Sequence, residues 1–432
     1  MSTENLDRLQ EQRPYGPNAQ VAEGRCYVFV ADGMNIGGIE TLLIRMANQV
    51  AELGYPVIVI AQDGPCMGSL SNKVSTIRLA ARKSLFSQLK QLPTANLTHK
   101  TRVFIWAAIP YSLVSIYKYQ RHLYREKAVE SVSVSGIFGP ARSFQSLKHR
   151  LEMIRHRLVL GWLPRDSVYF MSKAVQDTYI TQFGSSFACS PIHKLSLDHS
   201  DAVWQPRESN VFKIVSIGRI TKFKPYNFGA LDVVESMVEK NIAVHWSIWG
   251  HGDESELLEK AIRDRGLSSY VTFEGELPYS QFKPVALDAD LFVGMGTAAL
   301  EAALMGVPTV VALTWSRLGT YGFLHQCPVD SIGEHCTGHE ETSLIDIILS
   351  YSGSSKEQRL EIGLLCREAA SRKTSDDPAP FDSMFENGIK YPSIHSVSLR
   401  MIAFGAAQNV WVVFKSLVSF VKAMDRSVRG NG

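Results

Sequence analysis

The sequence lacks an apolar run long enough to cross a bilayer. Its longest such run, VFIWAAIPYSLVSIY from Val103, is about 15 residues long and contains Pro110, whereas a membrane-spanning helix needs roughly 20 apolar residues. We therefore expect a buried strand that continues into a loop and a helix. A secretory leader is also missing, and the polar residues 1–24 predict a flexible N-terminal arm.

Paired cysteines and a strong net charge are missing too. The net formal charge is only +3, and no CxxC spacing occurs among the six cysteines, Cys26, Cys66, Cys189, Cys327, Cys336 and Cys366. This pattern predicts reduced thiols in a cytoplasmic protein, and the charge gives no argument for nucleic acid. His335, Cys336 and His339 are close in sequence, but without a fourth ligand a solvated loop is favoured over a zinc site.

The length predicts two domains. A chain of 432 residues exceeds the roughly 250–300 residues that usually share one core. The composition, with 45% hydrophobic and 20% charged residues, is that of an ordinary globular protein.

The N-terminal half begins with a strand, a Gly-rich turn, a helix and a second strand. The run YVFVA from Tyr27 precedes Gly37 and Gly38, a helical pattern follows over 42–53, and VIVIA starts at Val57. This order predicts a right-handed βαβ unit with its loop at the carboxyl edge of a parallel sheet. We assign it to an N-terminal Rossmann-like domain over 25–200.

The C-terminal half repeats this alternation. Apolar strand-like runs occur at 212–218, 244–250, 271–275, 291–294 and 308–313, with helical patterns at 230–240 and 298–305. The pattern predicts a second parallel α/β domain over 211–390, joined to the first near 190–210. The strand-end loops of two such domains would face each other across a cleft, which suits a reaction of two substrates.

Two basic residues follow the first strand of the second domain. Arg219 and Lys224 come directly after Gly218, where both cations can reach a diphosphate and stabilise its charge as a leaving group without a metal. A solvated basic loop fits the same spacing equally well.

A second phosphate-binding element follows the strand LFV. The backbone N–H groups of a helix start bind anions, and Gly allows close approach; the residues concerned are Gly294, Met295, Gly296, Thr297 and Ala298. Glu301 lies about one turn into this helix, where a carboxylate can accept both ribose hydroxyl protons. The alternative is a glutamate that only complements the helix dipole.

These elements together resemble a known family. Gly218-Arg219 with Lys224, Trp249-Gly250-His251-Gly252, the run VTFEG from Val271, and the Glu301 helix with Gly306-Val307-Pro308 occur in the order and spacing of the group-one glycosyltransferases. These are retaining, metal-independent enzymes of the GT-B fold. The resemblance is strong over 211–313 and weaker over the N-terminal half, where the Gly37-Gly38 turn supports it.

The resemblance implies roles for the matching residues. Arg219 and Lys224 would hold the donor diphosphate, Glu301 would bind ribose, and Gly37 and Gly38 would lie beside the phosphates and the acceptor. Backbone groups from Phe273 to Leu277 would contact the base, while Gly218, Gly250 and the loop Gly294, Met295, Gly296, Thr297 and Ala298 complete the donor site. No cofactor is implied beyond the nucleotide sugar as substrate.

Two positions depart from the family pattern. Val293 stands where a glutamate commonly faces the transferred sugar, and Gly139 stands where many members carry a histidine. Retaining transfer can proceed without a protein base, because a donor phosphate oxygen can take the acceptor proton. The leading hypothesis is a retaining glycosyltransferase that moves a hexose to a glycan or lipid-linked acceptor in polysaccharide biosynthesis. The alternative is a catalytically silent relative that binds a nucleotide sugar or glycan. An epimerase would need a compact set of acidic and histidine bases, which the sequence does not provide.

Two segments raise the question of a membrane surface. Cations outnumber acids over 118–165, and apolar residues at helical spacing within 146–163 predict a helix that lies on an anionic membrane at the inner face or packs on the N-terminal sheet. The apolar segment within 391–432 is expected to form the last helix, crossing back onto the N-terminal domain, with membrane contact as the alternative.

Overall fold

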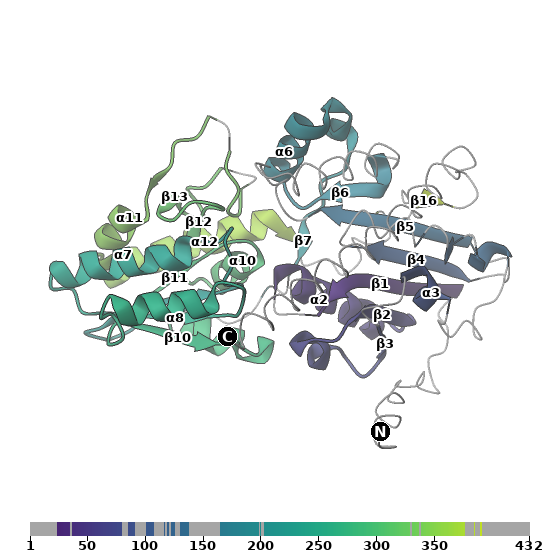
Figure 1. Ribbon diagram of the computed structural model, residues 1–432. Coiled ribbons are helices and arrows are strands. Elements are labelled where there is room, and N and C mark those ends of the chain that lie inside the picture. Colours follow the sequence, from purple (N-terminus) through teal and green to yellow (C-terminus); the bar gives the residue numbers. More distant parts are fainter. Residues whose placement is uncertain are drawn as a thin grey trace, which may run out of the picture.

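In its described residues, the computed structural model contains two seven-stranded sheets, each with helices around it (Figure 1), and one two-stranded sheet. It describes residues 24–34, 37–79, 85–90, 101–107, 116, 119–120, 122–125, 130–137, 165–197, 199, 203–328, 331–336, 338–375, 384 and 389–390. Among these residues, no helix has the length and apolarity needed to cross a membrane.

The first sheet belongs to the N-terminal half. Its strand order is β16-β5-β4-β1-β2-β3, with β6 beside β5, and all pairs except β16·β5 are parallel. The strands are β1 (Arg25–Gly33), β2 (Val57–Gln62), β3 (Val74–Arg78), β4 (Arg102–Ala107), β5 (Glu130–Ile137), β6 (Val168–Phe170) and β16 (Ile389–Lys390). The central strand β1 is an almost continuous apolar run because a parallel sheet is covered on both faces.

Helix α2 (Gly38–Glu52) is the longest described helix around this sheet. It follows β1 as the sequence predicts, and it buries Leu42, Leu43, Met46 and Val50. Other helices in the described part of this half are η2 (Pro65–Ser69), α3 (Leu85–Leu89), η4 (Arg165–Ser167), α6 (Lys173–Phe183) and η5 (Ser185–Cys189). The βαβ unit β1-α2-β2 therefore places Gly37 and Gly38 at the carboxyl edge of β1.

The second sheet has the order β10-β9-β8-β11-β12-β13-β14. Its strands are β8 (Phe212–Ile217), β9 (Val244–Trp249), β10 (Val271–Gly275), β11 (Leu291–Gly294), β12 (Thr309–Ala312), β13 (Gly319–Phe323) and β14 (Thr342–Ser343). The first five are parallel, whereas β13 and β14 are antiparallel additions at one edge. The predicted parallel α/β arrangement is thus confirmed for both halves.

Helices of the second half lie around this sheet. They are α7 (Tyr226–Glu239), α8 (Ser255–Asp264), η6 (Tyr279–Gln281), α9 (Phe282–Leu287), α10 (Thr297–Leu304), α11 (Leu344–Ser352) and α12 (Lys356–Lys373). A capping box at Ser355 and Gln358 defines the start of α12, because each side chain bonds the other's backbone N–H.

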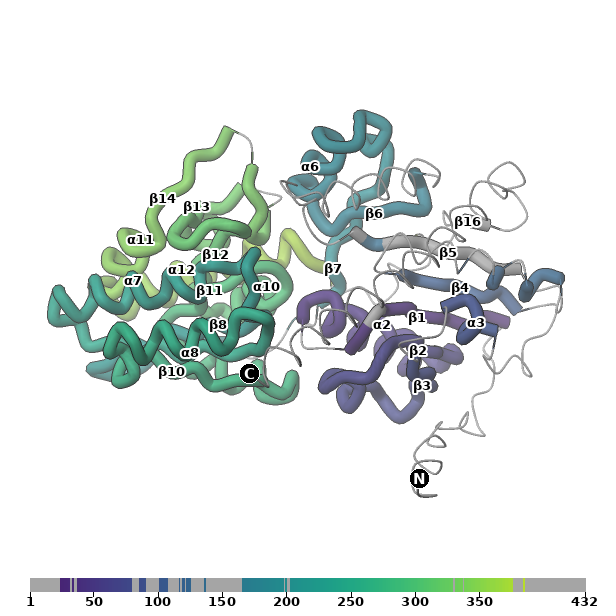
Figure 2. The backbone as a smooth tube through the Cα atoms, in the orientation of Figure 1, coloured from purple at the N-terminus to yellow at the C-terminus, as the bar shows by residue number. Residues whose placement is uncertain are grey.

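Within the described residues, two short strands pair where the chain passes between the halves. The strand β7 (Leu195–Ser196) pairs in parallel with β15 (Thr374–Ser375), and β7 lies between the two sheets (Figure 2). Trp204, although it precedes 211, packs in the second half, where its indole N–H donates to the Ala289 carbonyl at 2.7 Å.

The chain returns to the first sheet earlier than we expected. The predicted donor range 211–390 ends in β16 (Ile389–Lys390), which pairs with β5 rather than with the second sheet. Several predictions lie outside the described residues. They are the N-terminal arm apart from Gly24, the role of Gly139, the helix over 146–163 and the last helix over 391–432.

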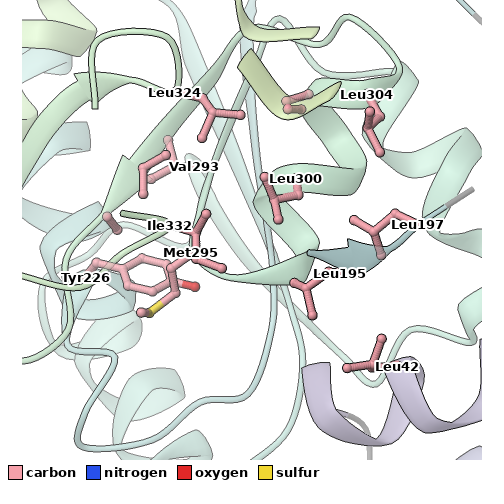
Figure 3. Close-up of a cluster of buried hydrophobic side chains, with 14 of the residues drawn as sticks. Leu42, Leu195, Leu197, Tyr226, Val293, Met295, Leu300, Leu304, Leu324 and Ile332 are labelled. Carbon is pink, nitrogen blue, oxygen red and sulfur yellow. The ribbon is translucent and has the colours of Figure 1, made fainter. Parts of the chain in front are cut away.

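One apolar cluster extends from one half to the other. Figure 3 shows Leu42 of α2 facing Leu195, Leu197, Leu300 and Leu304. These side chains are at most 5% exposed, so the contact between α2 and α10 is part of the core.

Candidate functional site

The loop after β8 carries the two predicted phosphate-binding cations. Its backbone is bonded to the loop after β9, because the Gly218 N–H donates to the Trp249 carbonyl at 2.9 Å and the Ile220 N–H to that of His251 at 3.2 Å. Gly250 has φ of +146°, and a Cβ there would overlap the Gly218 carbonyl oxygen. The paired glycines of the Trp-Gly-His-Gly motif therefore allow the two strand-end loops to meet.

Arg219 contacts the Gly-rich turn of the other half. Its Nη2 lies 3.0 Å from Glu40 Oε1, and the Glu40 side chain is 14% exposed. A Cβ on Gly37 would overlap both the guanidinium and the carboxylate. A side chain at this position would displace these two groups, so glycine leaves room for Arg219 at the start of α2.

Lys224 lies partly buried on the same loop. Desolvation lowers the pKa of its ammonium group to about 8; the neighbouring Arg219 cation also lowers it, and Glu40 raises it. A bound anion would replace the lost solvation and favour the charged lysine. A lowered pKa of this kind is expected of a lysine that binds a negatively charged ligand.

The start of α10 lies against the other glycine of the turn. A Cβ on Gly38 would lie 2.8 Å from Thr297 Oγ1. Gly296, with φ of +67°, precedes the helix, and its N–H donates to the Ile332 carbonyl at 2.6 Å. The Gly296 amide is therefore engaged within the protein, whereas the amides of Thr297 and Ala298 belong to the first helical turn, where no intrahelical partner exists.

Two further loop residues are closely packed. A Cβ on Gly294 would lie 2.7 Å from the Phe292 ring, and one on Gly333 would lie 2.7 Å from Met295. Val293 is fully buried in β11, in the apolar cluster with Met295 (Figure 3). The position of the missing family glutamate is thus occupied by a core side chain.

Glu301 is held at both oxygens. Arg45 Nη1 of α2 lies 2.8 Å from Oε1, and the Tyr279 hydroxyl donates to Oε2 at 2.9 Å. The Arg45 and Glu301 side chains are 9% and 13% exposed, and the Arg45 guanidinium lies 5.6 Å from the Tyr279 ring centre. Because Glu301 is the fifth residue of α10, these contacts explain it better than the helix dipole does.

The predicted base-contacting segment adjoins this carboxylate. Phe273 is half-buried in β10, Leu277 is buried, and the Gly275 carbonyl accepts the Gly250 N–H at 2.7 Å. Tyr279, two residues after Leu277, contacts Glu301. The segments predicted to bind base and ribose are therefore neighbours.

The structure brings the predicted residues to one place and adds some that the sequence did not indicate. Gly37 contacts Arg219 and Gly38 contacts Thr297, so elements from both halves meet there. The added residues are Glu40, Arg45 and Tyr279. Arg45 did leave a signal, since a charge among the buried positions of an amphipathic helix needs a partner.

The side chain of His335 and the backbone of Cys336 contact other groups of the protein. His335 Nδ1 lies 2.8 Å from Glu341 and Nε2 lies 2.6 Å from the Thr314 carbonyl, while the Cys336 N–H bonds the Tyr321 hydroxyl at 2.8 Å. In the part of the chain that the structure describes, no three His, Cys, Asp or Glu side chains are grouped to hold a metal ion.

The fold, in contrast to the sequence, has clear relatives. No protein-family model and no curated protein matches the chain. The structure of HepE from Anabaena with UDP and glucose matches with a TM-score of 0.57 and 17% identity over 81% of this chain and 95% of that one.

Two further structures agree. A TarM variant of S. aureus, in complex with fondaparinux, alpha-GlcNAc-glycerol and UDP, matches at TM-score 0.59 and 12% identity over 84% of this chain and 98% of TarM. WaaG, a glycosyltransferase involved in lipopolysaccharide biosynthesis, matches at 0.56 and 13% over 83% and 98%. At these identities the likeness concerns the fold, and the chain has the GT-B fold.

Proposed function

We propose that the protein is a retaining glycosyltransferase that moves a hexose from a nucleoside-diphosphate sugar to a glycan or lipid-linked acceptor. The observation that carries this proposal is that Arg219, on the same loop as Lys224, lies against the Gly37-Gly38 turn, while Glu301 pairs with Arg45 of the helix that follows this turn. Two cations and a carboxylate at one sheet edge match a ligand that has both a diphosphate and vicinal hydroxyls.

UDP is the first nucleotide to test. The structures of HepE and TarM that resemble this chain both contain UDP. Phosphate groups would take Arg219 and Lys224 as partners, and the α10 start would add backbone N–H donors. The charge that develops on the leaving diphosphate is then stabilised by fixed cations, with no metal or other cofactor proposed.

Glu301 can bind ribose while its ion pair with Arg45 stays intact. A carboxylate has about four lone-pair positions; the Tyr279 hydroxyl donates to one on Oε2, and Arg45 forms an ion pair at Oε1. The ribose hydroxyls can donate to the remaining ones, displacing the Tyr279 hydroxyl where the geometry requires it. The ion pair with Arg45 orients the carboxylate for this contact.

Val293 cannot act as the base that takes the proton from the acceptor hydroxyl. That side chain is apolar and fully buried. A donor phosphate oxygen on the same face of the sugar takes the proton in our proposal, which is why retention of configuration is part of it. The same observation favours the second candidate, a silent relative that binds a nucleotide sugar without turnover.

Donor binding can be tested by thermal shift. Purified wild type is screened against UDP- and GDP-sugars, and a stabilising donor is then repeated with Glu301→Ala and with Glu259→Ala, an exposed glutamate of α8, as the matched control. We expect stabilisation of the wild type and the control only. A wild type that no donor stabilises, or equal stabilisation of Glu301→Ala, would overturn the binding site. Stabilisation without donor turnover would favour the silent relative.

A lipid-linked acceptor would place the protein, cytoplasmic in our proposal, at the inner membrane face. The basic segment 146–163 supports this through its composition alone. Sedimentation with anionic liposomes at rising salt is the test: we expect binding that salt weakens, and no binding at low salt would contradict the membrane proposal.

A further inference from the structure

Tyr226 opens α7 two residues after Lys224, and its hydroxyl has no partner. The side chain is 1% exposed, and among the described residues no group hydrogen-bonds the hydroxyl. In the preceding loop, the Oγ1 atom of the partly buried Thr221 is likewise buried and without a hydrogen-bond partner among the described residues. Buried hydroxyls are almost always hydrogen-bonded, so two such atoms beside one loop indicate a ligand-binding position.

The Tyr226 hydroxyl and the Lys224 ammonium flank the same glycine. A Cβ on Gly218 would lie 3.3 Å from Lys224 Nζ and 3.6 Å from the Tyr226 hydroxyl oxygen. On the other side, the ring lies against Met295, with Val293 and Ile332 beside it (Figure 3). The phenol therefore lies between the cationic loop and the loop before α10.

The chemistry of the phenol fits an anion. Burial raises the pKa of Tyr226, so the group stays protonated and offers one O–H donor. A phosphoryl oxygen only accepts hydrogen bonds, and a neutral donor reaches it without repulsion from the nearby cations.

We propose that the Tyr226 hydroxyl donates a hydrogen bond to the sugar-bearing phosphate of the bound donor, beside Lys224. This inference rests on the proposed function and narrows its ligand. It makes Tyr226 a binding residue that distinguishes a nucleoside diphosphate from a monophosphate, since only the diphosphate supplies the acceptor. A nucleotide that ends at the first phosphate gains nothing from the hydroxyl.

The test compares two nucleotides on matched tyrosine variants. UDP and UMP, or GDP and GMP if the thermal-shift screen selects guanine, are titrated calorimetrically into the wild type, Tyr226→Phe and Tyr351→Phe. Tyr351 is the control because its buried hydroxyl has a partner, the Asp290 carbonyl at 3.0 Å. Tyr226→Phe should fold at least as stably as the wild type, since it removes an unpartnered buried hydroxyl.

We expect Tyr226→Phe to lower the affinity for the diphosphate by about tenfold and to leave the affinity for the monophosphate unchanged. Tyr351→Phe should lower the melting temperature and leave both affinities unchanged. Unchanged diphosphate affinity in Tyr226→Phe would overturn the inference while the proposed function stands. Equal losses with both nucleotides would also overturn it, because they indicate a structural role. A wild type that binds neither nucleotide would overturn the proposed function and this inference with it.

Discussion

Lys224 is partly buried beside another cation, and its pKa is lowered to about 8. In the free protein the side chain loses its proton as the pH rises through this value. The unfolded chain, with an ordinary lysine, still holds that proton up to about pH 10.5. The Lys224 contribution to stability therefore improves with rising pH in this window, whereas its attraction for a diphosphate declines.

The first prediction concerns this titration. We expect UDP affinity to fall by up to about tenfold for each pH unit above about 8, because a proton must be taken up on binding. Calorimetry in buffers of different ionisation enthalpy should detect that uptake. Lys224→Met should abolish it, whereas Lys222→Met, at a side chain that is 74% exposed, should not. Equal proton uptake in Lys224→Met would show that another group titrates.

The second prediction concerns the buried pair Arg45–Glu301. Glu301→Gln leaves a cation that is 9% exposed without its counter-charge, and we expect a loss of about 3 kcal/mol in the free energy of unfolding. Adding Arg45→Met should restore part of this stability but not donor binding. Urea denaturation of both single variants and the double variant measures the coupling.

A matched control for this cycle is the exposed pair Lys356–Glu208, with side chains 54% and 86% exposed. Its removal should change the stability by less than about 1 kcal/mol. Additive effects of Arg45→Met and Glu301→Gln would contradict a direct interaction between the two side chains.

At the scale of elements, the strand-end loops are fixed by glycines. The third prediction compares Gly250→Ala with Gly54→Ala, since both residues have positive φ, +146° and +87°, but nothing lies within 4 Å of a Cβ at Gly54. Gly54→Ala should cost about 1 kcal/mol through backbone strain. Gly250→Ala should cost about 3 kcal/mol, because it also displaces the Gly218 carbonyl.

The two glycine variants should also differ in their affinity for the donor nucleotide. Because the displaced loop carries Arg219 and Lys224, Gly250→Ala should weaken nucleotide binding, whereas Gly54→Ala should not. Chemical denaturation and calorimetry measure the two effects. Equal costs for both variants would contradict the close approach of the loops after β8 and β9.

The sequence predicted those helices and strands best that have one clear hydrophobic periodicity. The apolar run of β1, the Gly-rich turn and the amphipathic α2 follow from residues close in the chain, and the structure confirms them. The antiparallel strand β13, GTYGF, was not predicted, because its pattern of glycines is typical of a turn. Its pairing with β12 depends on a neighbour, not on its own composition.

At the scale of the whole molecule, the contacts between the halves were beyond sequence reasoning. The pairs Arg219–Glu40 and Arg45–Glu301 join residues more than 170 positions apart, and they depend on how the two sheets are placed. The family resemblance indicated Arg219 and Glu301 but not their partners. That Arg219 and Glu301 bind a donor stays a prediction.

The central claim is sugar transfer with retention, and one measurement tests it most directly. The wild type is incubated with a ¹³C-labelled α-linked nucleotide sugar that stabilises it, and NMR follows nucleotide release and the configuration of the sugar product that forms first. We predict release of the nucleoside diphosphate and an α-configured first product, at a rate that Arg219→Ala lowers by at least about a hundredfold. A β-configured first product would contradict retention, and bound donor that is never cleaved, even with glycan or lipid-linked acceptors present, would contradict transfer itself.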